Sequence, residues 1–208
     1  MTLGICSNVA KKQKIGPHFE EKEGKTVFHL VPKKAFFTRG LGRHPEKLTS
    51  FEMALRSAGI AHLNLVRVSS IFPPHCELVS RTEGIQELNP GQIVPVVMST
   101  LESNEPNRLV AASVGIAIPR DRSRYGYLSE HHAFGQNETI AGDYAEDLAA
   151  EMLATILGVE FDPEASWDEK RNLWKISGRI VRTQNITQTA VVDKKGRWTT
   201  VVAAVVLL

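Results

Sequence analysis

Residues 197–208 read RWTTVVAAVVLL, and the last eight of them are all apolar. A strand that is apolar on both faces needs cover on both sides, so this segment predicts a strand buried in the core. Residues 176–192 (ISGRIVRTQNITQTAVV) have the composition of another strand, and Asp193–Gly196 (DKKG) of the turn that follows it. We therefore expect a hairpin whose last strand is buried.

Further strands precede this hairpin. Their segments alternate apolar with polar residues or are bounded by Gly and Pro, and they are residues 26–40 (TVFHLVPKKAFFTRG), 62–72, 91–100, 108–119 and 124–134. Because Gly and Pro interrupt regular structure, the stretch through Gly40, Gly42 and Pro45 predicts a loop after the first strand.

Two segments have helical spacing. Residues 51–58 (FEMALRSA) follow Thr49 and Ser50, the expected start, and Gly59 stands where a C-cap glycine belongs. Residues 144–157 (YAEDLAAEMLATIL) form the second helix, ended by Gly158. Strands outnumber helices, which favours an α+β fold: a sandwich of mainly antiparallel β-sheet covered by two helices, in an αββα-like arrangement.

Composition indicates one folded domain. The chain has 208 residues, 42% of them hydrophobic, which suffices for a single core spanning residues 26–208. Residues 1–25 carry many charges and few large apolar side chains, so we expect a flexible N-terminal tail. A net charge of +2 disfavours nucleic acid as a partner, and the lysines at 11, 12 and 14 have the pattern of a solvated arm.

Two cysteines, Cys6 and Cys76, cannot build a disulfide scaffold or a four-cysteine zinc site, and they fit a reducing compartment. The N-terminus has no apolar stretch of signal-peptide length, and the longest apolar run is far below the roughly 20 residues of a membrane span. We expect a soluble cytoplasmic protein without a membrane partner.

Most catalytic signatures are missing from the sequence. It has no glycine-rich dinucleotide or P-loop motif and no HExxH helix. His131 and His132 are adjacent on a predicted strand, so they point to opposite faces and do not predict a metal site. We also expect Cys76 beside His75 to be an inert small hydrophobe rather than a nucleophile.

The segment Val68–Pro74 (VSSIFPP) is unusual. Two hydroxyls, Ser69 and Ser70, end an apolar strand, and Pro73-Pro74 at once redirects the chain. Serines at such a strand end commonly satisfy backbone groups. The alternative is a corner that holds a reactive peptide bond.

Four stretches together resemble the pyruvoyl-dependent arginine decarboxylases: residues 58–60 (AGI), 64–74 (NLVRVSSIFPP), 113–121 (SVGIAIPRD) and 126–130 (GYLSE). The resemblance covers Thr26 to Gly158, with a continuation into the last hairpin. It implies a proenzyme that cuts itself between Ser69 and Ser70 into a β chain (1–69) and an α chain (70–208). Ser70 would become a covalent pyruvoyl cofactor, and the enzyme would convert L-arginine to agmatine and CO₂, for polyamine synthesis or acid resistance.

The resemblance also implies roles for three other residues. Glu130 matches the catalytic glutamate that returns a proton to the substrate α-carbon, and Asn64 matches a residue that hydrogen-bonds near the pyruvoyl group or polarises the Ser69 carbonyl. Glu52 stands where the family has an aspartate that clasps the guanidinium of the substrate. The family assembles as homotrimers with the reactive centre between protomers, and no metal is implied.

Other interpretations of these residues and of the function remain open. Asn64 has the character of an ordinary strand-edge residue and Glu52 that of a solvated helix residue. Because Glu52 is one methylene longer than aspartate, the same pyruvoyl chemistry on another amino acid is a second hypothesis. A third, from a different class, is an uncleaved and non-catalytic homologue that acts as a binding or scaffold protein.

Overall fold

The structure is a computed structural model that describes residues 19–22, 25–28, 30–158 and 179–208. The chain forms two compact units, Met1–Val31 and Pro32–Leu208. In the first unit, β1 (Phe19–Lys22) and β2 (Lys25–Phe28) form an antiparallel hairpin. The lysines at 11, 12 and 14 lie outside the described residues, and the flexibility of the tail stays a prediction.

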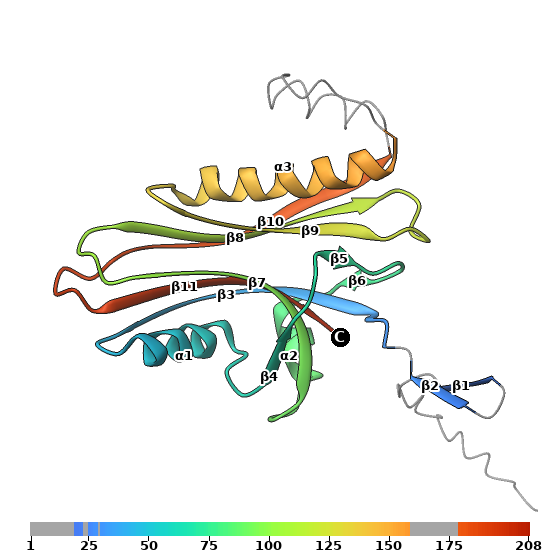
Figure 1. Cartoon of the computed structure of the whole chain (residues 1–208), viewed down its shortest axis with the longest axis horizontal. Helices are drawn as coiled ribbons and strands as arrows, with labels where there is room; N and C mark the ends of the chain where they lie inside the picture. The colour runs from blue at the N-terminus through green and yellow to red at the C-terminus, as the bar shows by residue number, and fades with distance from the viewer. Residues whose placement is uncertain (1–18, 23–24, 29, 159–178) are drawn as a thin grey trace, which may run out of the picture. The chain divides into compact units, whose positions relative to one another are not determined.

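The second unit is a sandwich of two stacked sheets with helices on the outer faces (Figure 1). The five-stranded sheet has the order β4 (Asn64–Arg67), β7 (Ile93–Ser103), β11 (Trp198–Leu207), β3 (Lys34–His44), β6 (Glu77–Leu78). The four-stranded sheet has the order β10 (Ile180–Val191), β8 (Leu109–Pro119), β9 (Gly126–Phe134), β5 (Ile71–Phe72). Pairing is antiparallel except for β3 with β6 and β4 with β7.

Helix α1 (Lys47–Ala58) covers the five-stranded sheet and α3 (Glu138–Ile156) covers the four-stranded sheet, so the αββα-like α+β sandwich is confirmed (Figure 1). A third helix, α2 (Arg81–Gln86), was not predicted. It is short, and its start is capped by the Ser80 hydroxyl, which accepts from the Glu83 N–H at 3.2 Å. A helix of six residues is too short to produce a periodic apolar pattern.

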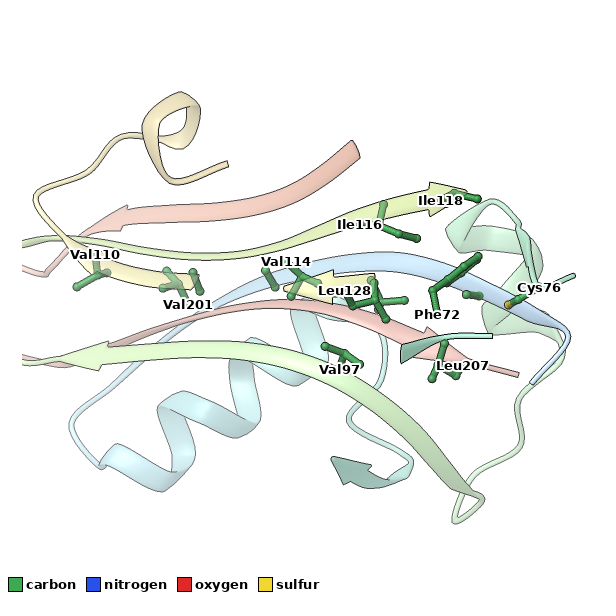
Figure 2. Packing of buried hydrophobic residues seen from close by; sticks show 14 of the residues in the cluster. Phe72, Cys76, Val97, Val110, Val114, Ile116, Ile118, Leu128, Val201 and Leu207 are labelled. Carbon is green, nitrogen blue, oxygen red and sulfur yellow. The ribbon is translucent and has the colours of Figure 1, made fainter. Parts of the chain in front are cut away.

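Strand β11 is buried on both faces, as the sequence predicts. Val201, Ala203 and Val205 face the core between the two sheets, where Figure 2 shows Val201 and Leu207 among the packed side chains. The intervening residues Val202, Ala204 and Val206 face the layer under α1. Both faces are covered because β11 is the central strand of a sheet that lies between α1 and the other sheet.

The predicted hairpin of the last two strands is wrong. Strand β10 pairs with β8 in the four-stranded sheet, whereas β11 pairs with β3 and β7 in the other sheet. The turn at Asp193–Gly196 therefore carries the chain from one sheet to the other. A local turn signal cannot distinguish these cases, because the partner of each strand comes from distant sequence.

The predicted loop through Gly40 and Gly42 is also wrong, since β3 continues to His44. A Cβ atom at Gly40 would lie 2.0 Å from the Ala54 carbonyl oxygen, and one at Gly42 would lie 1.9 Å from the Ser50 carbonyl oxygen. The two glycines thus let α1 lie directly against the strand instead of breaking it.

Both predicted helices exist, but both start earlier than expected. Helix α1 begins at Lys47, so Ser50 is an internal residue whose buried hydroxyl lies 2.7 Å from that of Thr200. Helix α3 begins after Asn137, whose side chain accepts from the Ile140 N–H at 2.9 Å. The C-cap at Gly59 is confirmed, with a left-handed φ of 78°.

Candidate active site

The two serines link the two sheets. They follow β4 of the five-stranded sheet and precede β5 of the four-stranded sheet. On one side the Val68 N–H donates to the Val96 carbonyl at 3.1 Å, and on the other the Leu128 N–H donates to the Ser70 carbonyl at 2.8 Å. The Ser69–Ser70 peptide is therefore held between strands that belong to different sheets.

A tight turn surrounds Ser70. The Ile71 N–H donates to the Ser69 carbonyl at 2.9 Å, which closes a three-residue turn. Phe72 is buried in the core between the sheets and anchors the chain after the turn (Figure 2). Among the described residues, neither serine hydroxyl has a hydrogen-bond partner, so the Ser70 oxygen is available for chemistry.

Glu130 lies two residues beyond Leu128 on β9. Leu128 faces the core between the sheets, whereas the Ser129 hydroxyl donates to the Ala145 carbonyl of α3. Because strand side chains alternate, Glu130 shares the face of Leu128, roughly 7 Å further along the strand. The carboxyl group thus lies on the same side of the sheet as the residue that holds Ser70.

A backbone amide orients the Glu130 carboxyl group. Its Oε1 accepts from the Met98 N–H of β7 at 3.2 Å. That amide is available because β4, the neighbour of β7, pairs only as far as Val96. At the next residue, the Ser99 hydroxyl donates to the His131 carbonyl at 2.6 Å. Two successive residues of β7 therefore form hydrogen bonds with two successive residues of β9.

A cavity of about 810 Å³ opens beside Glu130, large enough for an amino acid. Arg67 lines it and donates to the Thr100 hydroxyl at 3.1 Å. The other lining residues are Lys47, Phe51, Met98, Ser99, Leu101, Glu102, His132 and Trp198. His131 lies on the opposite face, as strand alternation predicts, with its ring centroid 4.4 Å from that of Tyr144.

Asn64 and Glu52 lie elsewhere in the chain. Asn64 begins β4, and its Nδ2 donates to the Gly91 carbonyl at 2.7 Å. Ser69 is five residues further, which is roughly 15 Å of extended chain. Glu52 on α1 accepts from Arg56 Nε at 2.5 Å and lines a separate cavity of about 370 Å³ with Gly59, Ala61 and His62. Within one chain, Glu130 thus lies two residues beyond Leu128, which holds Ser70, whereas neither serine lines the 810 Å³ cavity and both Asn64 and Glu52 lie elsewhere.

The sequence did not point to the backbone amides of Met98, Leu128 and Ile71. Every residue except proline carries such an amide, so only the pairing of strands shows which amides donate to Ser69, Ser70 and Glu130. Cys76 is buried, and burial raises the pKa of its thiol to about 11, which keeps the thiol protonated near neutral pH.

The described part of the chain contains no group of three or more His, Cys, Asp and Glu side chains that could hold a metal ion. Within the same residues, no helix has the length and apolar character to cross a membrane.

Comparison with known proteins gives a consistent result. The model of the family described as pyruvoyl-dependent arginine decarboxylase matches residues 34–208. The pyruvoyl-dependent arginine decarboxylase of Nitrosopumilus maritimus is 63% identical over 182 residues, which cover 88% of this chain and 100% of the relative. Pyruvoyl-dependent arginine decarboxylase 2 of Methanosarcina acetivorans is 55% identical over 179 residues, covering 86% of this chain and 98% of the relative. A probable pyruvoyl-dependent arginine decarboxylase of Chloroherpeton thalassium is 57% identical with the same coverage.

Proposed function

Because this chain belongs to the pyruvoyl-dependent arginine decarboxylase family, we propose that it cuts itself between Ser69 and Ser70 to form its own cofactor. The enzyme decarboxylates L-arginine to agmatine and CO₂ with a pyruvoyl group. The products of cleavage are a β chain of residues 1–69 and an α chain of residues 70–208. The observation that carries this site is the Ser69–Ser70 link, clamped on both sides while the Ser70 hydroxyl has no partner among the described residues.

The cleavage chemistry balances with the groups of this chain and one water. Ser70 Oγ bonds to the Ser69 carbonyl carbon, the peptide C–N bond breaks, and the hydroxyl proton ends on the Ser70 nitrogen. Loss of the Ser70 Cα proton then breaks the Cβ–Oγ bond, which releases Ser69 as a carboxylate and leaves dehydroalanine. Water converts dehydroalanine into the pyruvoyl group and releases ammonia.

Glu130 is the proposed acid of turnover. The pyruvoyl group supplies a ketone that condenses with the substrate amine and takes up the electron pair released with CO₂. One oxygen of the Glu130 carboxyl group is held by the Met98 N–H, and the group faces the 810 Å³ cavity. This arrangement suits a side chain that must carry a proton to one defined carbon atom.

We assign Glu52 to the guanidinium of arginine and Asn64 to the neighbourhood of the pyruvoyl group. Since both lie away from Ser70 within one chain, these roles need a second copy, which supports an oligomer with shared sites; that this oligomer is a homotrimer rests on the resemblance to the family. Exposed apolar side chains around β4, β5 and the start of β7 support such a contact: Val66, Val68, Ile71 and Ile93. A cytoplasmic location and a role in polyamine synthesis stay predictions.

Mass spectrometry of the purified, denatured protein tests this function. We expect two chains of 69 and 139 residues, the longer one lacking a free amino terminus. In a CO₂-release assay with arginine, ornithine, lysine and aspartate, arginine is the preferred substrate. A chain that stays intact over several pH values contradicts the mechanism and favours a non-catalytic homologue, and preference for another amino acid contradicts the role of Glu52.

A further inference from the structure

We propose that the backbone N–H of Ile71 is the oxyanion donor for self-cleavage. During attack by Ser70 Oγ, the Ser69 carbonyl oxygen takes up negative charge, and a donor already aimed at that oxygen stabilises it. The inference rests on the proposed function, because it requires that the Ser69–Ser70 bond is the one cleaved. It places the donor in the same three-residue turn as the nucleophile.

The geometry of the turn carries the proposal. The Ile71 nitrogen lies 2.9 Å from the Ser69 carbonyl oxygen, an ordinary hydrogen-bond distance, so the N–H is already directed at the atom on which negative charge would develop. Asn64, the residue whose side chain matches the family position for polarising this carbonyl, gives its amide to the Gly91 carbonyl instead. In the described chain, Ile71 is therefore the donor that already contacts the scissile carbonyl.

Pairing of β5 with β9 explains why the Ile71 amide is available. The described residues contain no cis peptide bond, so the Ser70 C=O and the Ile71 N–H point in opposite directions. The Ser70 C=O points towards β9, where it accepts from the Leu128 N–H at 2.8 Å. The Ile71 N–H consequently points away from the ladder and towards Ser69.

The same contacts hold the donor rigid. The Leu128 N–H holds the carbonyl oxygen of the Ser70–Ile71 peptide, and Phe72, the next residue, is held by its buried side chain. A peptide clamped in this way need not reorganise when charge develops on the Ser69 oxygen. Loss of one such donor typically slows a reaction by about 10²–10³-fold.

Replacement of the amide by an ester tests the donor directly. The α-hydroxy acid analogue of isoleucine at position 71 removes the N–H and keeps the side chain. Starting from newly synthesised full-length chain, we expect the first-order rate of cleavage to fall by about 10²–10³-fold. Ile71→Val retains the N–H and should cleave within about threefold of the wild-type rate.

Two matched ester controls separate chemistry from loss of structure. The hydroxy analogue of valine at Val192 removes an N–H that donates to the Arg108 carbonyl at 2.8 Å, far along the chain from the serines, and should leave cleavage unchanged. The hydroxy analogue of leucine at Leu128 removes the clamp on Ser70 while keeping the Ile71 donor. It should slow cleavage by less than about tenfold, since one neutral hydrogen bond contributes about 1 kcal/mol.

Two outcomes overturn the proposal. One is cleavage of the position-71 ester within threefold of the wild-type rate, and the other is an equal loss at positions 71 and 128. Hydrogen exchange in the uncleavable Ser70→Ala chain is an independent measurement, in which the Ile71 amide should be protected. An unprotected amide would also reject the donor. If wild-type chain stays intact or breaks elsewhere, the proposed function itself fails, whereas normal wild-type cleavage with an unaffected ester rejects only the donor.

Discussion

The two ends of β4 differ in what surrounds them. At its carboxyl end, Ser69 and Ser70 cross to the other sheet, and β9 supplies both the Leu128 amide and the Glu130 carboxyl group. At its amino end, Asn64 binds the Gly91 carbonyl, near the chain segment that lines the Glu52 cavity. The carboxyl end of β4, here called the cleavage end, thus carries the groups proposed for self-cleavage and turnover. The amino end, here called the recognition end, lies near Glu52, the acid proposed to bind the substrate. Changes at the two ends should therefore have separable effects.

The largest effect is expected at the cleavage end. Ser70→Ala removes the attacking oxygen, so the chain should remain whole, folded and without pyruvoyl group. Denaturing electrophoresis should show one band after prolonged incubation, and the decarboxylase activity should be undetectable. If this variant still cuts at the same bond, another nucleophile makes the cleavage.

Glu130→Gln should separate the two proposed functions of the cleavage end, which are self-cleavage and decarboxylation. The glutamine can still accept from the Met98 N–H but has no acidic proton, so cleavage should proceed nearly normally while turnover falls by about 10²–10⁴-fold. Both quantities should be measured on one preparation, with turnover expressed per pyruvoyl group. A fully cleaved variant with wild-type turnover would show that another group protonates the substrate carbon.

Glu52→Gln changes only the recognition end. We expect normal cleavage and a loss of about 10- to 100-fold in kcat/KM for arginine, the cost of removing the charge from one ionic hydrogen bond. Glu83→Gln is a matched control, because Glu83 also forms a surface ion pair, with Lys34 at 3.3 Å. An equal effect in the control, or slowed cleavage in Glu52→Gln, would contradict the separation of the two ends.

Mixed assemblies test whether the two ends of different chains meet. Ser70→Ala chains retain Glu52, and Glu52→Gln chains retain the pyruvoyl group, so random trimers of the two should regain about a quarter of the wild-type sites if each site is shared between protomers. Activity of the coexpressed mixture is the measurement. Activity no greater than that of Glu52→Gln alone would place both groups in one chain.

The smallest effect concerns the ion pair that holds Glu52. The Arg56 side chain is 73% exposed, and such surface pairs contribute only about 0–1 kcal/mol. Arg56→Ala should release Glu52 for the substrate and lower KM for arginine by less than about fivefold, with unchanged cleavage. A large rise in KM would instead mean that Arg56 holds Glu52 in its binding position.

The sequence alone predicted the layers of this protein, because they depend on burial. Strand β11 is apolar at every position from Val201, and such a strand is stable only when both faces are covered. The resemblance at Val68–Pro74 and at Glu130 likewise identified the family, since the residues that carry the chemistry are distinctive side chains in a fixed order.

Only the tertiary structure decided how these pieces meet. The turn at Asp193–Gly196 connects β10 and β11, which belong to different sheets, and Gly40 and Gly42 lie within a strand, where their missing side chains let α1 pack against it. The amides of Ile71, Leu128 and Met98 donate to Ser69, Ser70 and Glu130 because strands from distant parts of the chain end or pair beside them. The pattern of side chains predicts which residues are buried and which can take part in chemistry. The direction of a backbone amide depends instead on its strand partners, which local sequence does not specify.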